Sequence, residues 1–352
     1  MEIIKREFLP RYTTSVHAPT IEKFNDHFVF AWFGGTREGD EDSSIFVYNL
    51  NNDQKVISVG TKDRIPRWNP ILFNYDNRIW MFEKFGMFCD QWQTMVHDMT
   101  KWDNGIIEKE IMKTGQCLHA GLNGPVKTRP LSGKFIIDGK KANVICGSSV
   151  ETFYDWTSYM EYYNFNRGKI EFVGRSNPLS IDSKSSYIDP YGRTRTVKGI
   201  IQPSLFIHEN KAYALMRSCY GLGKIYLSCE TEGGWCSPFK TNIYNPNSGI
   251  CVVSCGGDIY LCHNPSNKNR YPLYLSRIGI QNKDLIIYES LQIEGQCSGD
   301  GCISNELSYP YMIVDGDKIH LVYTYGRSKI EYVQIYLYNA RKSSIEGLKA
   351  CL

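Results

Sequence analysis

SYPYMIVDGDKIHLVYTYGR, residues 308–327, consists of two apolar strands joined by the polar turn Asp315-Gly316-Asp317. Runs rich in Val, Ile and Tyr on both sides of a short Asp and Gly turn are typical of a β-hairpin. Pro310 stands near the start of the first strand, where a missing N–H costs no ladder hydrogen bond if this strand begins at a lip. The stretch therefore predicts an antiparallel hairpin that opens a sheet.

The same pattern recurs five more times upstream. The copies read VHAPTIEKFNDHFVFAWFGG (from Val16), RWNPILFNYDNRIWMFEKFG (from Arg67), KTRPLSGKFIIDGKKANVICGSS (from Lys127), IQPSLFIHENKAYALMRS (from Ile201) and NSGICVVSCGGDIYLCHNPS (from Asn247). Five of the six copies carry Pro at one register, and Gly249 takes that place in the fifth. Self-similar segments of this length indicate the blades of a propeller. Because the strands of a β-sandwich are not copies of one another, the sequence predicts an all-β, six-bladed β-propeller.

Length and composition fit one large repetitive unit. The chain has 352 residues, 13% of them aromatic, and no long apolar stripe of helical period is evident. We expect a single domain over residues 1–352, with a long insertion between blades at about 150–198. The other strands of the blades are expected after the hairpins, in DSSIFVYNL, KIYLSCE, YPLYLSRIG and KIEYVQIYL.

Charge and hydropathy argue against several classes of partner. Forty Lys and Arg residues oppose 37 Asp and Glu residues, which leaves a dispersed net charge of +3. This balance gives no strong basic field for nucleic acid or an anionic membrane. The N-terminal MEIIKREFLP is charged where a signal peptide is apolar, and no 18-residue apolar run occurs. We expect a soluble monomer or weak oligomer, cytoplasmic by default or else virus-encoded or released.

The cysteines predict buried thiols and no metal site. Seven of the 12 lie in or beside apolar strand-like text, namely Cys89, Cys146, Cys219, Cys251, Cys255, Cys262 and Cys351. Cys297 and Cys302, in GQCSGDGCISN, could form a local bridge. The spacings include no paired C-x-x-C motif for zinc, no P-loop and no dinucleotide-binding glycine motif. We therefore expect neither a metal nor a cofactor.

Propeller geometry predicts a polar channel mouth, where the starts of first strands and the ends of second strands converge. The starts are His17, Trp68, Asn69, Lys127, Arg129, Gln202, Ser248 and Tyr309, and the ends are Arg37, Glu38, Glu83, Lys84, Glu151, Arg217, His263, Asn264, Tyr325 and Arg327. An Arg-rich ring suits an anionic sugar or a carboxylate, which Arg binds through two parallel hydrogen bonds. In a wet channel the same groups can instead satisfy the backbone or one another.

Six phrases in order resemble the sialidase superfamily, and within it the BNR-repeat, neuraminidase-like branch. They are HAPTIEKFNDHFVFAWFGGTREGDEDSSIFV, RWNPILF, NGPVKTRPL, IQPSLF, NPNSGI and SYPYMIVDGDKIHLVYTYGRSKI, and together they span about residues 15–333. Residues 228–235, SCETEGGW, resemble a degenerate Asp-box, which in that family stabilises an outer hairpin turn and carries no catalysis. The resemblance implies a sialidase-like propeller.

The resemblance also implies functional residues. Sialidases hold the sugar carboxylate with three arginines, use a Tyr nucleophile polarised by a Glu, and use an Asp as acid/base; the Tyr nucleophile departs from the usual pair of carboxylates. By position, Arg217 matches the second arginine, Arg270 the third and Tyr309 the nucleophile. Glu38 lies near the loop that carries the acid, with Asp40 close by.

Two positions depart from the family pattern. His17 stands where the family carries its first arginine, and Gln202 is the only candidate where the polarising Glu is expected. A Tyr hydroxyl is a poor nucleophile without such help. Glu151 or Glu161, from the 150–198 segment, could supply the missing carboxylate.

Three functions follow from these patterns. The first is a sialidase-like glycoside hydrolase, or a uronate-directed glycan-cleaving enzyme, that acts on a terminal acidic sugar of an oligosaccharide or glycoconjugate. Glu38 is its expected proton donor, Tyr309 or an activated water its nucleophile, and His17 a second acid/base group. The residues expected to bind substrate are Arg37, Trp68, Lys127, Glu151, Gln202, Arg217, Arg270 and Arg327. The alternatives are a non-catalytic glycan-binding propeller that keeps the arginines, and a protein-interaction propeller that uses its outer loops.

Overall fold

The computed structural model describes residues 1–50, 57–59, 64–100, 116–118, 121–188, 192–299 and 301–338. Over these ranges the chain is built of strands, with one short 3-10 turn at Cys89–Gln91. Among the described residues no helix has the length and apolar character needed to cross a membrane. The predicted all-β fold is confirmed.

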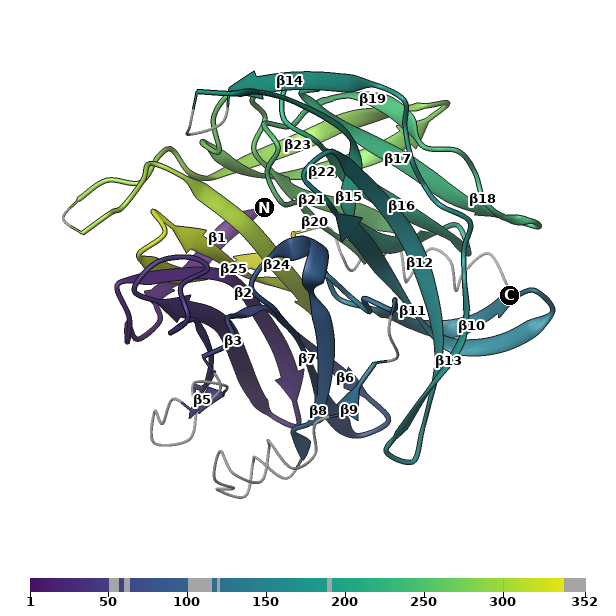
Figure 1. Ribbon diagram of the computed structural model, residues 1–352, viewed down its shortest axis with the longest axis horizontal. Helices are drawn as coiled ribbons and strands as arrows, with labels where there is room; N and C mark the ends of the chain where they lie inside the picture. Colours follow the sequence, from purple (N-terminus) through teal and green to yellow (C-terminus); the bar gives the residue numbers. More distant parts are fainter. Residues whose placement is uncertain are drawn as a thin grey trace.

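Six antiparallel blades lie around a central axis (Figure 1). Four of them are separate four-stranded sheets. The first blade comprises β2 (Ser15–Phe24), β3 (His27–Gly35), β4 (Ser44–Asn49) and β5 (Ile57–Val59), and the second comprises β6 (Arg67–Tyr75), β7 (Arg78–Phe85), β8 (Gln93–Asp98) and β9 (Gln116–Cys117). The fifth comprises β20 (Cys251–Cys255), β21 (Asp258–His263), β22 (Leu273–Gln281) and β23 (Asp284–Glu294), and the sixth β24 (Leu307–Asp315), β25 (Lys318–Tyr325), β26 (Lys329–Tyr336) and β1 (Glu2–Phe8). The six-bladed propeller predicted from the repeat is confirmed.

The third and fourth blades share one ten-stranded sheet. The third comprises β10 (Leu131–Ile137), β11 (Lys140–Glu151), β12 (Asp155–Asn166) and β13 (Lys169–Arg175); the fourth comprises β15 (Thr194–His208), β16 (Lys211–Ser218), β17 (Lys224–Thr231), β18 (Gly234–Trp235) and β19 (Phe239–Tyr244), with β14 (Lys184–Ile188) paired to β15. A short parallel pairing of β12 with β15, at Asp155↔Lys198 and Trp156↔Gly199, joins the two blades. The 150–198 segment therefore consists mostly of sheet, where the sequence suggested loop.

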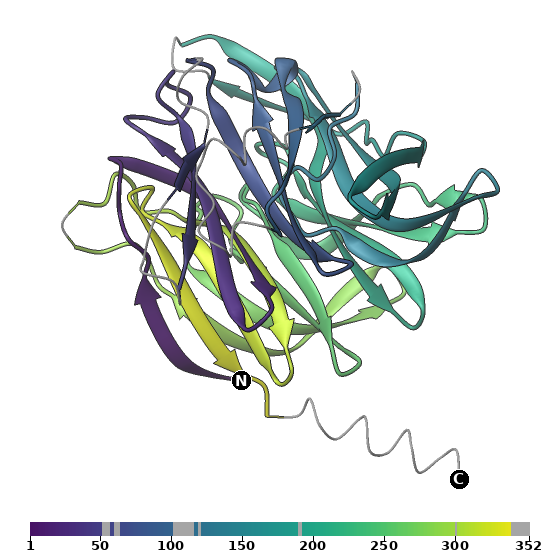
Figure 2. The ribbon, with the colours of Figure 1, turned by 90° about the horizontal axis from the view of Figure 1, so that it is seen from below.

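The N-terminal strand closes the ring. β1 pairs antiparallel with β26, from Glu2↔Tyr336 to Phe8↔Glu331. Figures 1 and 2 both show this purple strand beside the yellow strands of the sixth blade. Because the outermost strand of the last blade comes from the other end of the chain, unfolding at either end breaks the same sheet.

In four blades a β-bulge at a residue followed by Pro interrupts the innermost strand. The pairing register of these strands shifts around Ala18-Pro19, Asn69-Pro70, Gln202-Pro203 and Tyr309-Pro310. In each case the residue before Pro has a positive φ, between 39° and 56°. A bulge leaves a backbone group unpaired, and Pro has no N–H to leave unsatisfied. These four prolines therefore lie at bulges inside the innermost strands, and not at their lips as the sequence suggested, whereas Pro130 directly precedes β10, as the sequence suggested.

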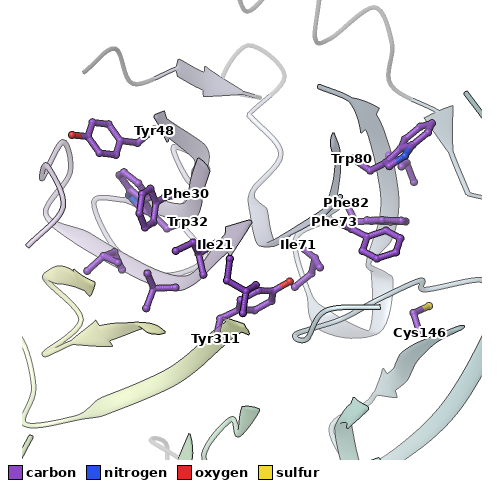
Figure 3. Close-up of a cluster of buried hydrophobic side chains, with 14 of the residues drawn as sticks. Ile21, Phe30, Trp32, Tyr48, Ile71, Phe73, Trp80, Phe82, Cys146 and Tyr311 are labelled. Carbon is purple, nitrogen blue, oxygen red and sulfur yellow. The ribbon is translucent and has the colours of Figure 1, made fainter. Parts of the chain in front are cut away.

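Apolar side chains fill the spaces between adjacent blades. Figure 3 shows Phe30 and Trp32 of the first blade and Phe73 and Phe82 of the second on either side of Ile21, Ile71 and Tyr311. Trp32 and Phe73 are fully buried. Burial of each such aromatic side chain contributes roughly 2 to 3 kcal/mol, so this packing between blades stabilises the propeller.

The cysteine predictions are largely confirmed. Cys146, Cys219, Cys251, Cys255 and Cys262 are buried free thiols, whereas Cys89 is only partly buried. Cys351 lies outside the described residues. A disulfide links Cys297 to Cys302.

Gly147 provides a test of how the third and fourth blades meet. A Cβ added there would lie 2.3 Å from the carbonyl oxygen of Pro203. Gly147→Ala should therefore lower the free energy of unfolding by about 2 kcal/mol or more, measured by chemical denaturation followed by circular dichroism. Gly233→Ala, where an added Cβ meets nothing within 4 Å, is the matched control. Equal midpoints for the two variants would contradict this close approach.

Candidate functional site

Tyr309 lies where side chains of several blades converge. Its φ of 53° at the bulge of β24 turns it toward its neighbours, and only 8% of it is exposed. Its hydroxyl accepts a hydrogen bond from Arg217 Nη1 at 3.2 Å and one from Gln202 Nε2 at 3.5 Å. The His17 ring lies against the Tyr309 ring, with the centroids 4.2 Å apart. The first, fourth and sixth blades therefore meet at this residue, as the sequence predicted.

Three cations surround the Tyr309 ring. Lys127 Nζ and Arg217 Cζ are each 5.5 Å from the ring centroid, and Arg270 Cζ is 6.0 Å from it. Cations at this distance are attracted to the face of an aromatic ring. The arrangement produces a compact positive site with a tyrosine at its centre.

Lys127 also supports the bulge. Its Nζ donates to the carbonyl oxygen of Pro310 at 2.6 Å, and burial lowers the pKa of this lysine to about 8. Gly249, the fifth-blade counterpart of the repeated Pro, leaves the space that Lys127 and Tyr309 occupy: an added Cβ would lie 3.2 Å from Lys127 Cε and 3.5 Å from Tyr309 Cα. The backbone around Tyr309 is therefore held from two other blades.

Glu151 is the carboxylate next to Gln202 and Arg217. Burial raises its pKa, and the Arg217 charge and a hydrogen bond with Gln202 offset part of that shift. Glu161, the other candidate from the sequence, lies elsewhere: it accepts hydrogen bonds from the backbone of Asn123 and Gly124 and pairs with Arg175. The structure thus brings Glu151, and not Glu161, to the Tyr309 site.

The His17 ring is buried, and its nitrogens make no hydrogen bonds to the described residues. Only 1% of the residue is exposed. Burial, followed by the charges of Arg327 and Arg270, lowers its pKa well below 6.5. The ring is therefore neutral at physiological pH. Because unfolded histidine takes up a proton near pH 6.5 and the folded ring does not, acidification through this range favours unfolding.

Glu306 is a functional candidate that the sequence analysis missed. Its carboxylate forms ion pairs with Arg327 Nε at 2.8 Å and with Arg270 Nη1 at 3.6 Å. It also lies 4.0 Å from His17 Nδ1. Arg327 also contacts Glu38. Glu306 directly precedes β24, which begins at Leu307. It therefore lies outside the strand starts and ends from which the channel mouth was predicted. Its position three residues before Tyr309 was the available signal.

The remaining predicted residues divide between the mouth and other sites. Trp68 packs against Phe33 and Trp92 with ring centroids 5.6 and 5.4 Å apart, and Phe33 contacts His17. Arg37 is exposed and pairs with Asp40, so it does not join the Tyr309 cluster.

Three other residues from the predicted mouth make contacts apart from the Tyr309 cluster. Glu83 accepts from Arg67 and contacts His97. Lys84 donates to Thr94 and to the carbonyl of Asn123, and burial lowers its pKa to about 7. Arg129 pairs with Glu22 at 2.7 Å and lines a separate cavity of about 260 Å³. Each of these groups is paired with other protein groups, as the simpler interpretation of a polar channel anticipated.

Several buried polar atoms at and beside the mouth lack hydrogen-bond partners within the described part of the chain. They are His17 Nδ1 and Nε2, Glu151 Oε1, Gln202 Oε1, Arg217 Nε, Asn247 Oδ1, Ser248 Oγ and Asn264 Oδ1. Buried polar groups are nearly always paired in folded proteins. Such a concentration of unpaired donors and acceptors is what a polar ligand or ordered water would satisfy. No cluster of three or more metal-ligating side chains occurs among the described residues.

The comparisons with known proteins agree with this architecture. The sequence profile of the BNR repeat-like domain matches residues 26–321. The chain belongs to the BNR repeat-like family. A search of curated protein sequences finds no match.

Solved structures with the same fold differ in what they do. A protein of unknown function from Dyadobacter fermentans is 11% identical, with a TM-score of 0.66, over 96% of this chain and 99% of that one. Trypanosoma rangeli sialidase in complex with sialic acid is 10% identical, with a TM-score of 0.56, over 97% of this chain and 57% of the sialidase. An α-L-arabinanase from Penicillium chrysogenum, complexed with arabinobiose, is 11% identical, with a TM-score of 0.55, over 95% and 97%. The sialidase-like propeller fold is thereby established, at identities too low to carry over an activity.

The electrostatics of His17 can be tested by NMR. We expect its ring to stay neutral as the pH falls through 6.5, and Arg327→Gln to raise its pKa only partly, because burial is the larger cause. His263, whose pKa burial alone lowers to about 4, is the internal control and should not respond to Arg327→Gln. A titration midpoint of His17 near pH 6.5 in the unaltered protein would show that its ring is exposed to solvent and would contradict this burial.

Proposed function

We propose that this propeller is a glycoside-active protein that binds a terminal acidic sugar at Tyr309. The observation that carries the proposal is the group of buried polar atoms without partners beside Tyr309, within a ring of positive charge. A sugar offers many hydroxyls, and an acidic sugar adds a carboxylate. Both kinds of group match donors and acceptors left unpaired in a largely buried mouth.

The ion pairs suggest where the acidic group binds. Arg270 and Arg327 already face Glu306. Arg217 and Lys127 have no carboxylate within ion-pair distance in the described ranges, and they are 4% and 2% exposed. Glu151 interacts with Arg217 only beyond ion-pair distance, and a buried charge without a contacting counter-ion is costly. A ligand carboxylate beside Arg217, within reach of Lys127, would remove that cost.

The proposed chemistry centres on Tyr309 and Glu151. Arg217 and Gln202 donate to the Tyr309 hydroxyl, so they would stabilise negative charge on this oxygen as it attacks the anomeric carbon. Glu151, with its raised pKa, suits a group that exchanges protons near neutral pH. Gln202 lies between Glu151 and Tyr309, so the phenol proton would reach Glu151 through a water or a side-chain movement.

Glu38 remains the proposed proton donor to the leaving group. It is exposed at the rim, in contact with Arg327, where an aglycone would leave. His17 takes a different part from the one expected from the sequence. As a neutral ring it would hydrogen-bond a sugar hydroxyl, and it would not act as the main acid/base group.

A specific observation favours a second candidate, a glycan-binding propeller without turnover. Tyr309 has two donors on its hydroxyl but no carboxylate bonded to it among the described residues. A nucleophile of this type normally needs an adjacent base. If Glu151 cannot take the proton, the same cations would bind an acidic sugar and release it unchanged.

Tyr309→Phe separates the two candidates, because it removes the hydroxyl and keeps the ring. If the protein is an enzyme, turnover of a sialoside or of a uronate-capped oligosaccharide should fall by about 100-fold or more, with ligand affinity changed by less than about tenfold. Absence of turnover in the unaltered protein across such a panel, together with measurable binding, would leave the binding function only.

Arg217→Gln tests the acidic ligand itself. Loss of a buried charge-assisted contact should weaken binding of the acidic glycan by about 10- to 100-fold, measured by isothermal titration calorimetry. Binding of the neutral glycan that lacks the acidic sugar should not change. Lys134→Gln, at an exposed position of β10, is the control for a lost positive charge. No binding of any acidic glycan by the unaltered protein would overturn the proposal.

A further inference from the structure

Cys229 and Cys236 form a close pair of thiols on the outer edge of the fourth blade. Cys229 lies in β17, and Cys236 directly follows β18. Their sulfur atoms are 3.3 Å apart, and both residues are partly exposed free thiols. The function proposed above makes no use of them.

The backbone holds these two residues opposite each other. β17 pairs with β18 at Glu230↔Trp235 and Thr231↔Gly234, and Cys236 N donates to Cys229 O at 2.9 Å, which extends the ladder by one pair. Opposed residues of antiparallel strands have Cα atoms about 4.5 to 5.5 Å apart, and disulfides span about 4.4 to 6.8 Å. A bond between the two sulfurs therefore needs only small side-chain rotations.

We propose that Cys229 and Cys236 are a redox-modification site, at which a low-molecular-weight disulfide such as oxidised glutathione forms an intramolecular disulfide. One protein thiolate attacks the glutathione disulfide, forms a mixed disulfide and releases one glutathione. The second protein thiolate attacks the protein sulfur of that mixed disulfide and releases the other glutathione. Two protein thiols and one glutathione disulfide thus become one protein disulfide and two glutathione thiols.

Lys211 is a positive charge beside this pair of thiols. Burial opposes its charge, but the contact with Cys229 raises the pKa of Lys211 overall. Burial and Cys236 raise the pKa of Cys229, and Lys211 partly offsets that rise. A neighbouring ammonium group stabilises a thiolate, so Lys211 favours ionisation within the pair, and whichever thiol ionises attacks the oxidant while the other resolves the mixed disulfide.

The bond would close the outer turn of residues 230–235. This turn carries Trp235, whose Nε1 donates to the Tyr162 hydroxyl of the third blade at 2.8 Å. The same turn holds the degenerate Asp-box, which in the resembling family stabilises this kind of hairpin. Oxidation would therefore stiffen the contact between the third and fourth blades.

A second opposed cysteine pair provides a natural contrast. Cys251 and Cys262 face each other on β20 and β21, but they are only 2% and 0% exposed. Both pairs also have a lysine nearby, since Lys127 acts on Cys251 and Cys262. Access from solvent is what distinguishes Cys229 and Cys236 from this second pair. An oxidant in solution should discriminate between the two pairs.

Peptide mapping tests the proposal directly. The full chain is incubated with oxidised glutathione in mildly alkaline buffer, quenched with acid, alkylated and digested with trypsin without reduction. Both cysteines fall in the tryptic peptide 225–240, so the intramolecular bond appears as a loss of two hydrogen atoms from that peptide. Peptide 241–268, which carries Cys251 and Cys262, should stay reduced, and dithiothreitol should reverse the change.

Two variants and one stability measurement complete the test. In the Cys236→Ser variant the reaction should stop at a glutathione adduct on Cys229. The Lys211→Met variant should form the disulfide several-fold more slowly. Oxidation should raise the melting temperature of the unaltered protein by about 3 °C. The melting temperature of the Cys229→Ser variant should not change on oxidation. A peptide 225–240 that stays reduced while the exposed Cys117 takes up glutathione would overturn the proposal.

Discussion

The arrangement of the site depends on one backbone device, the β-bulge at the residue before proline in the innermost strands. A non-glycine residue with positive φ is uncommon, and the residue before proline is further restricted. The strain is acceptable because proline leaves no unpaired N–H and because other blades hold the bulge in place. At Tyr309 this support is the Lys127 hydrogen bond to Pro310 O. Tyr309 is thus positioned by the propeller frame itself, and not by a flexible loop.

The electrostatics of the mouth follow from that placement. Four cations lie around a buried ring system, and like charges so close are tolerated only with counter-charges. Glu306 supplies one between Arg270 and Arg327, and a neutral His17 adds none. A protonated residue at position 17 would add a further buried positive charge. The uneven pairing leaves Arg217 and Lys127 as the cations that a bound anion would complement.

The sequence was informative where structure is locally determined. Hairpin turns, the repeated prolines and the polar ends of the strands are short-range features, and they led to the six blades and to the convergence of His17, Gln202, Arg217 and Tyr309. The sequence did not predict pairing between segments that are far apart along the chain. The closure of the ring by β1, the joining of β12 to β15 and the ion pairs of Glu306 each join segments whose partners no local pattern specifies.

The position of Glu151 illustrates how the fold can accommodate changes in its chemistry. In the resembling family, the carboxylate that polarises the tyrosine precedes the second arginine on the same blade, and Gln202 stands closest to that place here. Glu151 ends β11 on the neighbouring blade, yet it reaches Gln202 and Arg217 because strand ends of adjacent blades converge on one mouth. Gly147, which lets β11 approach the bulge of β15 at Pro203, makes this convergence close enough. A carboxylate at a strand end of one blade can therefore lie beside polar residues of the next blade, and in the function proposed above Glu151 would take the part of that glutamate.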